Sequence, residues 1–160
     1  MHEAGAGGDV RDLRERVMRE ALGLAAEAER AGEVPVGAVV VVGGEIVGRG
    51  FNRPISTHDA TAHAEVMALR DAGRRIGNYR LAGAELYVTV EPCVMCVGAM
   101  VHARIARLIY GASEPRTGAI ESTTRALELP SFNHRFAVVS GVLAAESRAL
   151  LQAFFRGRRS

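Results

Sequence analysis

The sequence predicts a single α/β domain in which a mixed sheet carries helices on both faces. Strand-like and helix-like segments alternate in the order α-β-β-α-β-α-β, followed after a loop by β-α, which favours such a sheet. The first strand-like segment, VPVGAVVVV, is continuously apolar, as is typical of a strand covered on both faces. A length of 160 residues suits one domain with a proper core.

The first half of the chain is expected to hold two helices and a hairpin. Over residues 9–31, apolar side chains recur at three- and four-residue steps among charges, and Gly32 is a natural helix stop. The next segment is interpreted as two strands joined by Gly43 and Gly44, a short hairpin signal. After a polar loop, a helix is expected over residues 61–75.

The second half continues the alternation. Its expected elements are a strand at 85–90, a helix at 93–103, a strand at 105–112, a short helix at 123–129, a strand within 132–143 and an amphipathic helix at 144–159. We expect the hairpin strands to be antiparallel and the later strands parallel. Residues 1–9, rich in glycine and alanine, are expected to be a disordered lead-in to a single domain over residues 10–160.

Composition and charge exclude several classes of protein. The net charge is only +2, and all twenty basic residues are arginine, which excludes lysine-dependent phosphate loops and Schiff bases. Arginine suits phosphate forks and base stacking, and FFRGRRS at the C-terminus is the most concentrated basic and aromatic segment. No run approaches the roughly 18 apolar residues of a membrane span. Two cysteines and no signal-peptide core favour the cytoplasm.

The segment Pro92-Cys93-Val94-Met95-Cys96 allows three interpretations. A redox pair would suit a thioredoxin-like fold, but there the pair usually follows the first strand. A structural zinc site needs four protein ligands, and the chain has no further cysteine. The histidines that could complete such a site are His2, His58, His102 and His134. The third interpretation joins the two cysteines to His63.

His63 and Cys93 each follow a loop or strand and open a helix, which is where ligands gather in α/β sheets. One histidine and two cysteines leave one tetrahedral zinc position open, the catalytic pattern, and helix N-termini favour thiolates. Glu65 lies roughly 200° around an ideal helix from His63, so the two side chains would point in nearly opposite directions. We expect Glu65 to act as acid and base on a water at the open position. His-x-Glu with Pro-Cys-x-x-Cys is the known signature of zinc nucleobase deaminases. The alternative is an ordinary solvated helix start.

The chain also resembles the bacterial tRNA-specific adenosine deaminases, within the cytidine deaminase-like superfamily, over about residues 11–159. The resembling segments are GEVPVGAVVV, GFNRPISTHDATAHAEVMALR, NYRLAGAELYVTVEPCVMCVGAMVHARIARLIYGA, RTGA, FNHR and LLQAFFRGRR. The resemblance implies a three-layer α/β/α sandwich with a mixed five-stranded sheet and one Zn²⁺ per subunit. It also implies a homodimer with sites near its interface, and a tRNA anticodon stem-loop as partner.

The resemblance implies roles for individual positions. The implied zinc ligands are His63, Cys93 and Cys96, with Glu65 as the proton shuttle. The positions implied for substrate are Asn52 and the backbone N–H of Ala64 at the base edge, Val34, Pro35 and Val36 in the pocket, and Asn133, Phe155 and Arg159 at the anticodon loop. Three positions depart from the family pattern. Glu114 stands for an aspartate in a loop near the target base, Glu121 adds a negative charge there unless it points away, and Val97 replaces a smaller residue.

The sequence therefore predicts zinc-dependent hydrolysis of adenosine to inosine, at the wobble position of a tRNA anticodon. One alternative is a deaminase of a free base or nucleotide, of the guanine or cytosine type, which shares the core motifs. The segments NHR and FFRGRR discriminate, because a small substrate does not need them. The other alternative is a non-catalytic zinc or RNA-binding module, which four protein ligands on the metal would favour.

Overall fold

The computed structural model describes the backbone of residues 2–159 and the side chains of residues 8–158. The helices are α1 (His2–Arg30), α2 (Pro54–Thr57), α3 (Ala64–Ile76), α4 (Val94–Ala103) and α5 (Ala144–Arg159), with a 3₁₀ turn at Ala126–Glu128. The strands are β1 (Gly37–Val42), β2 (Glu45–Phe51), β3 (Glu85–Val90), β4 (Arg107–Ala112) and β5 (Ala137–Val139). Every element expected from the sequence is found, and α2 is additional, within the segment predicted to be a polar loop.

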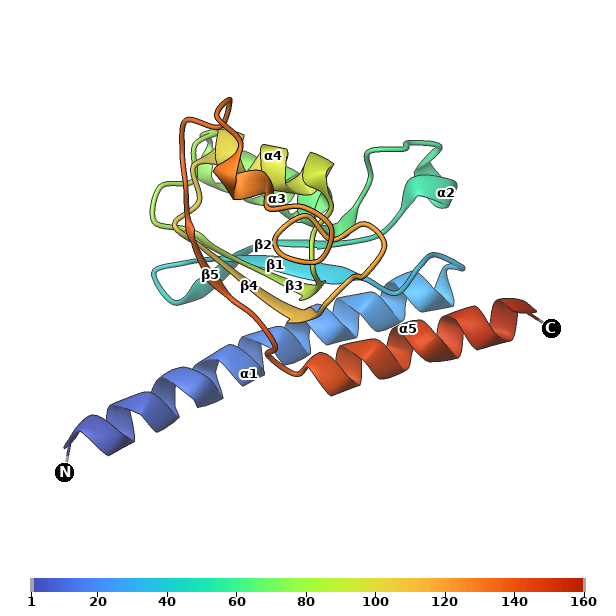
Figure 1. Ribbon diagram of the computed structural model, residues 1–160, viewed down its shortest axis with the longest axis horizontal. Helices are drawn as coiled ribbons and strands as arrows, with labels where there is room; N and C mark the ends of the chain where they lie inside the picture. The colour runs from blue at the N-terminus through green and yellow to red at the C-terminus, as the bar shows by residue number, and fades with distance from the viewer. Residues whose placement is uncertain (1, 160) are drawn as a thin grey trace.

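The five strands form one sheet in the order β2-β1-β3-β4-β5. The β1–β2 hairpin is antiparallel, β1 also pairs antiparallel with β3, and β4 runs parallel to both β3 and β5. Helices α1 and α5 cover one face of the sheet, and α3 and α4 cover the other (Figure 1). The predicted three-layer sandwich with a mixed five-stranded sheet is confirmed.

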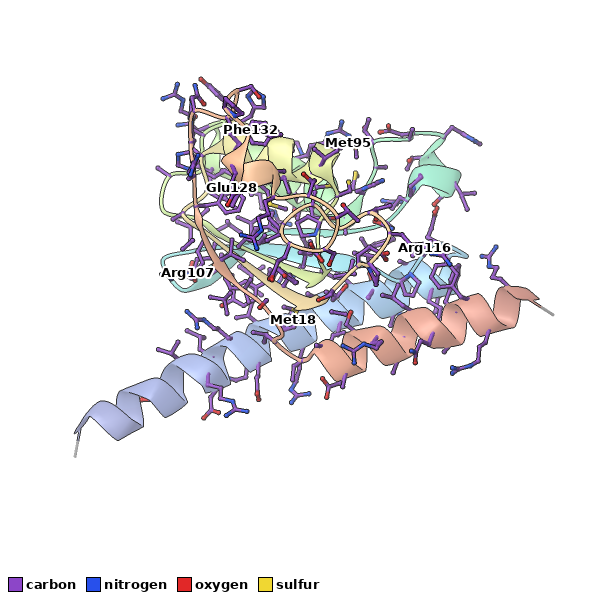
Figure 2. All side chains as sticks on the ribbon, in the orientation of Figure 1. Met18, Met95, Arg107, Arg116, Glu128 and Phe132 are labelled. Atoms are coloured by element: carbon purple, nitrogen blue, oxygen red, sulfur yellow. The ribbon has the colours of Figure 1, made fainter. Side chains whose placement is uncertain are left out.

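The apolar run in β1 serves two cores, one on each face of the sheet. Ala38 and Val40 lie in the core beneath α3 and α4, whereas Val39 and Val41 lie in the smaller core against α1. Because side chains alternate along a strand, a strand covered on both faces must be apolar at every position. Met18, labelled on α1 in Figure 2, is fully buried in the smaller core.

Two glycines of β2 let α3 approach the sheet closely. A Cβ atom at Gly48 would lie 2.5 Å from the carbonyl oxygen of Ala68, and one at Gly50 would lie 2.5 Å from that of Ala64. Both distances are shorter than real Cβ contacts, so only glycine fits beneath the helix at these two positions. The first turn of α3 is therefore held against β2 by direct backbone packing.

The first helix begins at His2, earlier than the predicted start at residue 9. The expectation that residues 1–9 form a disordered lead-in stays a prediction, and the side chains of residues 1–7 lie outside the described part of the chain. Among the described residues, no helix combines the length and apolar character that a membrane crossing requires.

Candidate metal centre and substrate pocket

His63 and Cys93 hold equivalent positions, each directly before a helix. The backbone is extended at both, with φ −74° and ψ 152° at His63 and φ −77° and ψ 172° at Cys93. Helix α3 then begins at Ala64 and helix α4 at Val94. The spacing of His63 and Glu65 is thereby explained, because only Glu65 is on the helix proper and the two side chains do not follow one helical register.

The donor atoms of the predicted ligands meet at one point. Nδ1 of His63 lies 3.6 Å from Sγ of Cys93 and 3.5 Å from Sγ of Cys96. A tetrahedral zinc with bonds of about 2.0 Å to nitrogen and 2.3 Å to sulfur places these atoms about 3.5 Å apart. Among the described residues, the possible metal-donor atoms of His63, Cys93 and Cys96 all lie within 4.8 Å of one another, and no fourth residue belongs to this group. The arrangement fits zinc with one coordination position left for substrate chemistry.

The electrostatics of the two cysteines favour metal binding. Hydrogen bonds from Cys96 and from His63 lower the pKa of the Cys93 thiol to about 4, despite partial burial. The same hydrogen bond with Cys93, together with burial, raises the pKa of the Cys96 thiol. The lowered pKa of the half-buried Cys93 favours the thiolate, the form that ligates metal, and a metal would displace the proton of the buried Cys96.

Glu65 is a buried carboxyl beside the ligand group. Its side chain is 3 % exposed and lines a cavity of about 150 Å³ together with His63 and Cys93. Burial above all, together with the negative charge of Cys93, raises the pKa of Glu65 to about 7, against the opposing effects of hydrogen bonding and of His63. A carboxyl with this pKa can both accept and release a proton near neutral pH, as acid–base catalysis requires.

The cavity collects residues from segments far apart in the sequence. Those anticipated from the sequence are Val34, Val36, Asn52, His63, Glu65, Cys93, Glu114 and Phe155. Those that sequence reasoning missed are Val90, Glu91, Thr117 and Leu151. Pro35 is buried but is not among the lining residues, because its neighbours Val34 and Val36 face the cavity instead.

Asn52 and Ala64 interact with each other. The backbone N–H of Ala64 donates to Oδ1 of Asn52 at 2.8 Å. Both groups were predicted to hold a base edge. In the structure the Ala64 N–H instead has its hydrogen-bond partner within the protein. The Asn52 side chain, which lines the cavity, therefore has its Nδ2 group left to donate.

Of the other predicted substrate contacts, Phe155 lies at the cavity and Asn133 does not. Phe155 is 48 % exposed, lines the cavity, and meets Phe154 edge to face at 5.4 Å between ring centres. Asn133 does not line the cavity, and its Oδ1 accepts a hydrogen bond from Arg104 at 3.0 Å. The side chain of Arg159 lies outside the described part of the chain.

The three departures from the family pattern are accommodated. The carboxylate of Glu114 accepts a hydrogen bond from the N–H of Arg116 at 2.9 Å, within the same loop. Arg116 is labelled in Figure 2. Glu121 accepts the hydroxyl of buried Tyr110 at 2.5 Å, so its carboxylate turns toward the sheet. Val97 is fully buried in the core beneath α3 and α4.

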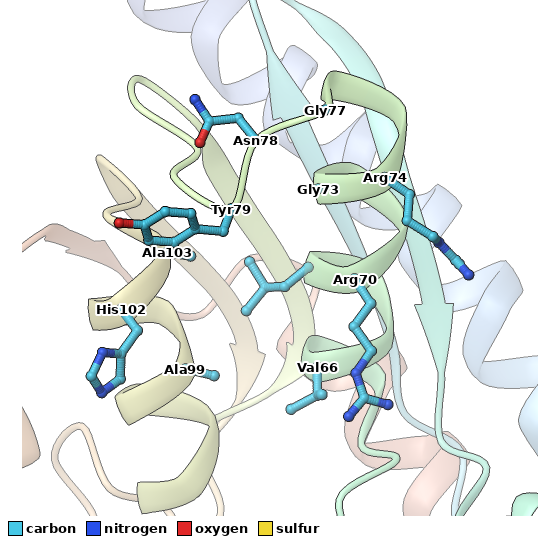
Figure 3. Close-up of a pocket in the computed structure, with 11 residues that line it drawn as sticks. Val66, Arg70, Gly73, Arg74, Gly77, Asn78, Tyr79, Ala99, His102 and Ala103 are labelled. Carbon is cyan, nitrogen blue, oxygen red and sulfur yellow. The ribbon is translucent and has the colours of Figure 1, made fainter.

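A second, larger groove lies apart from this chemistry. It has a volume of about 680 Å³ and runs between α3 and α4, with Tyr79 on one side and Arg70 on the other (Figure 3). None of the proposed metal ligands lines it, nor does Glu65. It is an open, mostly apolar surface, and Tyr79 is 73 % exposed.

The fold and the three-ligand site define a zinc-dependent deaminase domain. The family described as the cytidine and deoxycytidylate deaminase zinc-binding region matches residues 11–112. Similarity extends beyond this region. A tRNA-specific adenosine deaminase of Haemophilus influenzae is 51 % identical over 146 residues, covering 91 % of this chain and 84 % of that protein. One from Bacillus subtilis is 44 % identical over 145 residues, covering 91 % and 90 %.

Solved structures agree with these relatives. One, from a study of A-to-I editing by tRNA:A34 deaminases at the wobble position of transfer RNA, has a TM-score of 0.83 and 45 % identity, covering 85 % of this chain and 99 % of that one. The guanine deaminase from Nitrosomonas europaea has a TM-score of 0.74 and 25 % identity, covering 88 % and 83 %. The chain belongs to the family of tRNA-specific adenosine deaminases.

Proposed function

We propose that this protein hydrolyses the 6-amino group of adenosine at the wobble position of a tRNA anticodon, giving inosine and ammonia. The observation that carries the proposal is the buried Glu65 carboxyl beside the His63, Cys93 and Cys96 donors in one small cavity. A cavity of about 150 Å³ suits a single base taken out of its stack. The similarity to tRNA-specific adenosine deaminases supports adenosine in RNA as the substrate.

His63, Cys93 and Cys96 would hold the zinc ion, which would supply Lewis-acid chemistry that brings the pKa of a water toward neutrality. Glu65 takes a proton from the attacking water and delivers it to N1 of the adenine ring. The same carboxyl then takes the second proton of that water from the new hydroxyl on C6 and passes it to the amino group as the C6–N bond breaks, so that one water is consumed and one ammonia released. The raised pKa of Glu65 suits it to both directions of transfer.

Asn52 orients the base. Its Oδ1 is occupied by the N–H of Ala64, so Nδ2 donates into the cavity and recognises an acceptor nitrogen of the purine ring. Val34 and Val36 form apolar parts of the cavity wall, against which the planar ring packs. These groups hold the reacting carbon in place without taking part in proton transfer.

The RNA reaches the site along α5. Phe155 is exposed at the cavity, where it can stack on a base flanking the target. Arg156 and Arg158 follow on the same exposed helix end and attract phosphates. We include Asn133 and Arg159 in this surface, as the resemblance to tRNA deaminases implies.

The active form in this proposal is a cytoplasmic homodimer with one zinc ion in each subunit. The apolar groove between α3 and α4, with its exposed Tyr79, offers a surface on which a second copy can pack. Sedimentation equilibrium of the wild-type protein tests the dimer independently of activity.

The decisive experiment offers the zinc-loaded protein an anticodon stem-loop with a wobble adenosine, and separately adenine, guanine, cytosine and cytidine. Ammonia from the stem-loop alone is expected. Ammonia from guanine or cytosine alone would instead identify a free-base enzyme, to which the similarity with the guanine deaminase structure would then point. Truncation after Phe155 provides the matched control, because it should impair only an enzyme that grips RNA.

A further inference from the structure

Glu91 is a buried carboxylate that takes no part in the chemistry described above. It directly follows β3, is 2 % exposed, and lies two residues before Cys93. Backbone N–H groups converge on it from Glu114 at 3.1 Å, Ile120 at 3.1 Å, Glu121 at 2.9 Å and Ser122 at 3.0 Å. The hydroxyl of Ser122 donates to it as well. One carboxylate thus accepts five hydrogen bonds from the segment 114–122.

The segment has other attachments as well, since the N–H of Gly118 donates to the carbonyl oxygen of Glu114 at 2.9 Å and Ala119 is buried in the core beneath α3 and α4. Residues 113, 115–117 and 121–123 are nevertheless exposed, so core packing fixes only part of its path. It passes so close to Glu91 that a Cβ atom at Gly118 would lie 2.4 Å from the carboxylate carbon. The N–H of Ala119 also donates to the carbonyl oxygen of Pro92 at 2.8 Å. The segment is therefore wrapped around the strand end that leads to Cys93.

The same segment forms one wall of the cavity. Glu114 and Thr117 line the cavity, and so does Glu91 itself. We propose that Glu91 is a positioning residue whose carboxylate shapes segment 114–122 into the substrate-facing wall and registers that wall against the zinc-ligand segment. Glu91 acts through Glu114 and Thr117 on how the RNA is held, and it moves no proton.

An ionised carboxylate suits this role because it offers acceptors only. Replacing one of its oxygens with an amide nitrogen turns a donor toward backbone N–H groups, which no longer find an acceptor. Glu91→Gln keeps the size of the side chain and changes only this property. The inference rests on the proposed function for its substrate, but its structural part is measured without any substrate.

The test compares Glu91→Gln and the milder Ser122→Ala with wild type. Amide hydrogen exchange at residues 114 and 120–122 should be faster by about tenfold or more in Glu91→Gln. Ser122→Ala should accelerate exchange at the same residues, but by a smaller factor. KM for the anticodon stem-loop should rise by about tenfold in Glu91→Gln, with kcat changed much less. Zinc content should equal that of wild type in both variants.

Asp71→Asn is the matched control, since Asp71 accepts a backbone N–H from Arg49 at 2.9 Å but does not line the cavity. It should leave KM unchanged. Unaltered exchange at residues 114 and 120–122 in Glu91→Gln would overturn the proposal. So would exchange that accelerates equally in β3 and β4, or zinc loss in both variants. If wild type releases no ammonia from the stem-loop, the proposed function fails, while amide exchange still decides the role of Glu91.

Discussion

The N–H of Ala64 donates to Oδ1 of Asn52 at 2.8 Å and so ties the end of β2 to the residue between His63 and Glu65. This one contact fixes which end of the Asn52 amide faces the cavity. With the oxygen occupied, Asn52 has a donor left for the cavity, and its proposed role is to select a ring that offers an acceptor at that edge. The same contact also satisfies an N–H at the start of α3, which has no partner within the helix.

Asn52→Asp separates the two roles of Asn52. The aspartate keeps the acceptor for Ala64 but lacks the donor, so zinc content should match wild type while kcat/KM falls by about 10- to 100-fold. Asn52→Ala removes both groups and should lower the melting temperature as well. Steady-state kinetics with the stem-loop measure the effect, and wild-type activity in Asn52→Asp would contradict the orientation of the amide.

Glu65→Ala and Glu65→Gln should keep zinc and lose turnover. Removal of a proton-transfer group costs about 10²- to 10⁴-fold in rate. Because burial disfavours the charged carboxylate, Glu65→Gln should not reduce the free energy of unfolding. Single-turnover ammonia release, zinc analysis and urea denaturation test the three parts. Substantial remaining activity in either variant would contradict proton transfer by Glu65.

Cys93→Ala and Cys96→Ala should each lose zinc and with it activity. They should differ in stability, since Cys96 is fully buried and Cys93 is not. The cavity left in Cys96→Ala should cost about 1 kcal/mol more than the other change. Metal content by atomic emission and thermal melting make the comparison. Chelated wild type that regains activity on zinc addition serves as the control.

Gly50→Ala should destabilise the protein, because its new Cβ would press on the carbonyl oxygen of Ala64. We expect a loss of about 1–3 kcal/mol in the free energy of unfolding, the usual cost of overpacking. Gly23→Ala is the matched control, because Gly23 is an exposed position of α1 and nothing lies within 4 Å of its added Cβ. That change should stabilise by up to about 1 kcal/mol. Equal urea midpoints for the two variants would refute the close packing of α3.

Glu33 should make stability depend on pH. Burial acts to raise its pKa, but hydrogen bonds from Ser56 and Ile55 outweigh burial and hold the pKa below 4.5. A carboxyl with a lowered folded-state pKa stabilises fully above its unfolded pKa and loses that contribution as pH falls through the folded value. The stability gap between wild type and Glu33→Gln should therefore shrink below about pH 4.5.

Urea midpoints at several pH values measure this gap. Any loss of zinc in acid affects both proteins, so their difference isolates Glu33. A gap that stays constant from neutral pH down to pH 3 would show that the carboxylate is not the stabilising form.

Much of the fold was predictable because the signals are local. The apolar run of β1, the glycines of the hairpin and the period of α5 each predict an element from adjacent residues. The meeting of His63 with Cys93 was predictable for a topological reason, since both residues open helices at strand ends. Helix α2 was missed because four residues, Pro54–Thr57, are too few to show a period.

The parts of the site that could not be predicted depend on side-chain direction. Nothing in the sequence tells which end of the Asn52 amide faces inward, or that Glu121 turns toward Tyr110. Of the two phenylalanines of α5, Phe154 is partly buried and Phe155 is exposed, a difference that the sequence pattern does not give. Glu91 did leave a signal, because a charged residue directly after the apolar strand LYVTV must find partners if it is buried.

Leu151 and Phe155 line the same cavity as His63 and Cys93, which places the final helix beside residues synthesised far earlier. Proteins are made from the N-terminus, so all three proposed zinc ligands have emerged from the ribosome once Cys96 has left the exit tunnel. The cavity gains its last wall only when α5 is complete. The metal donors are thus all present in the chain before the cavity wall is, and the cavity cannot close around a base until α5 has been made.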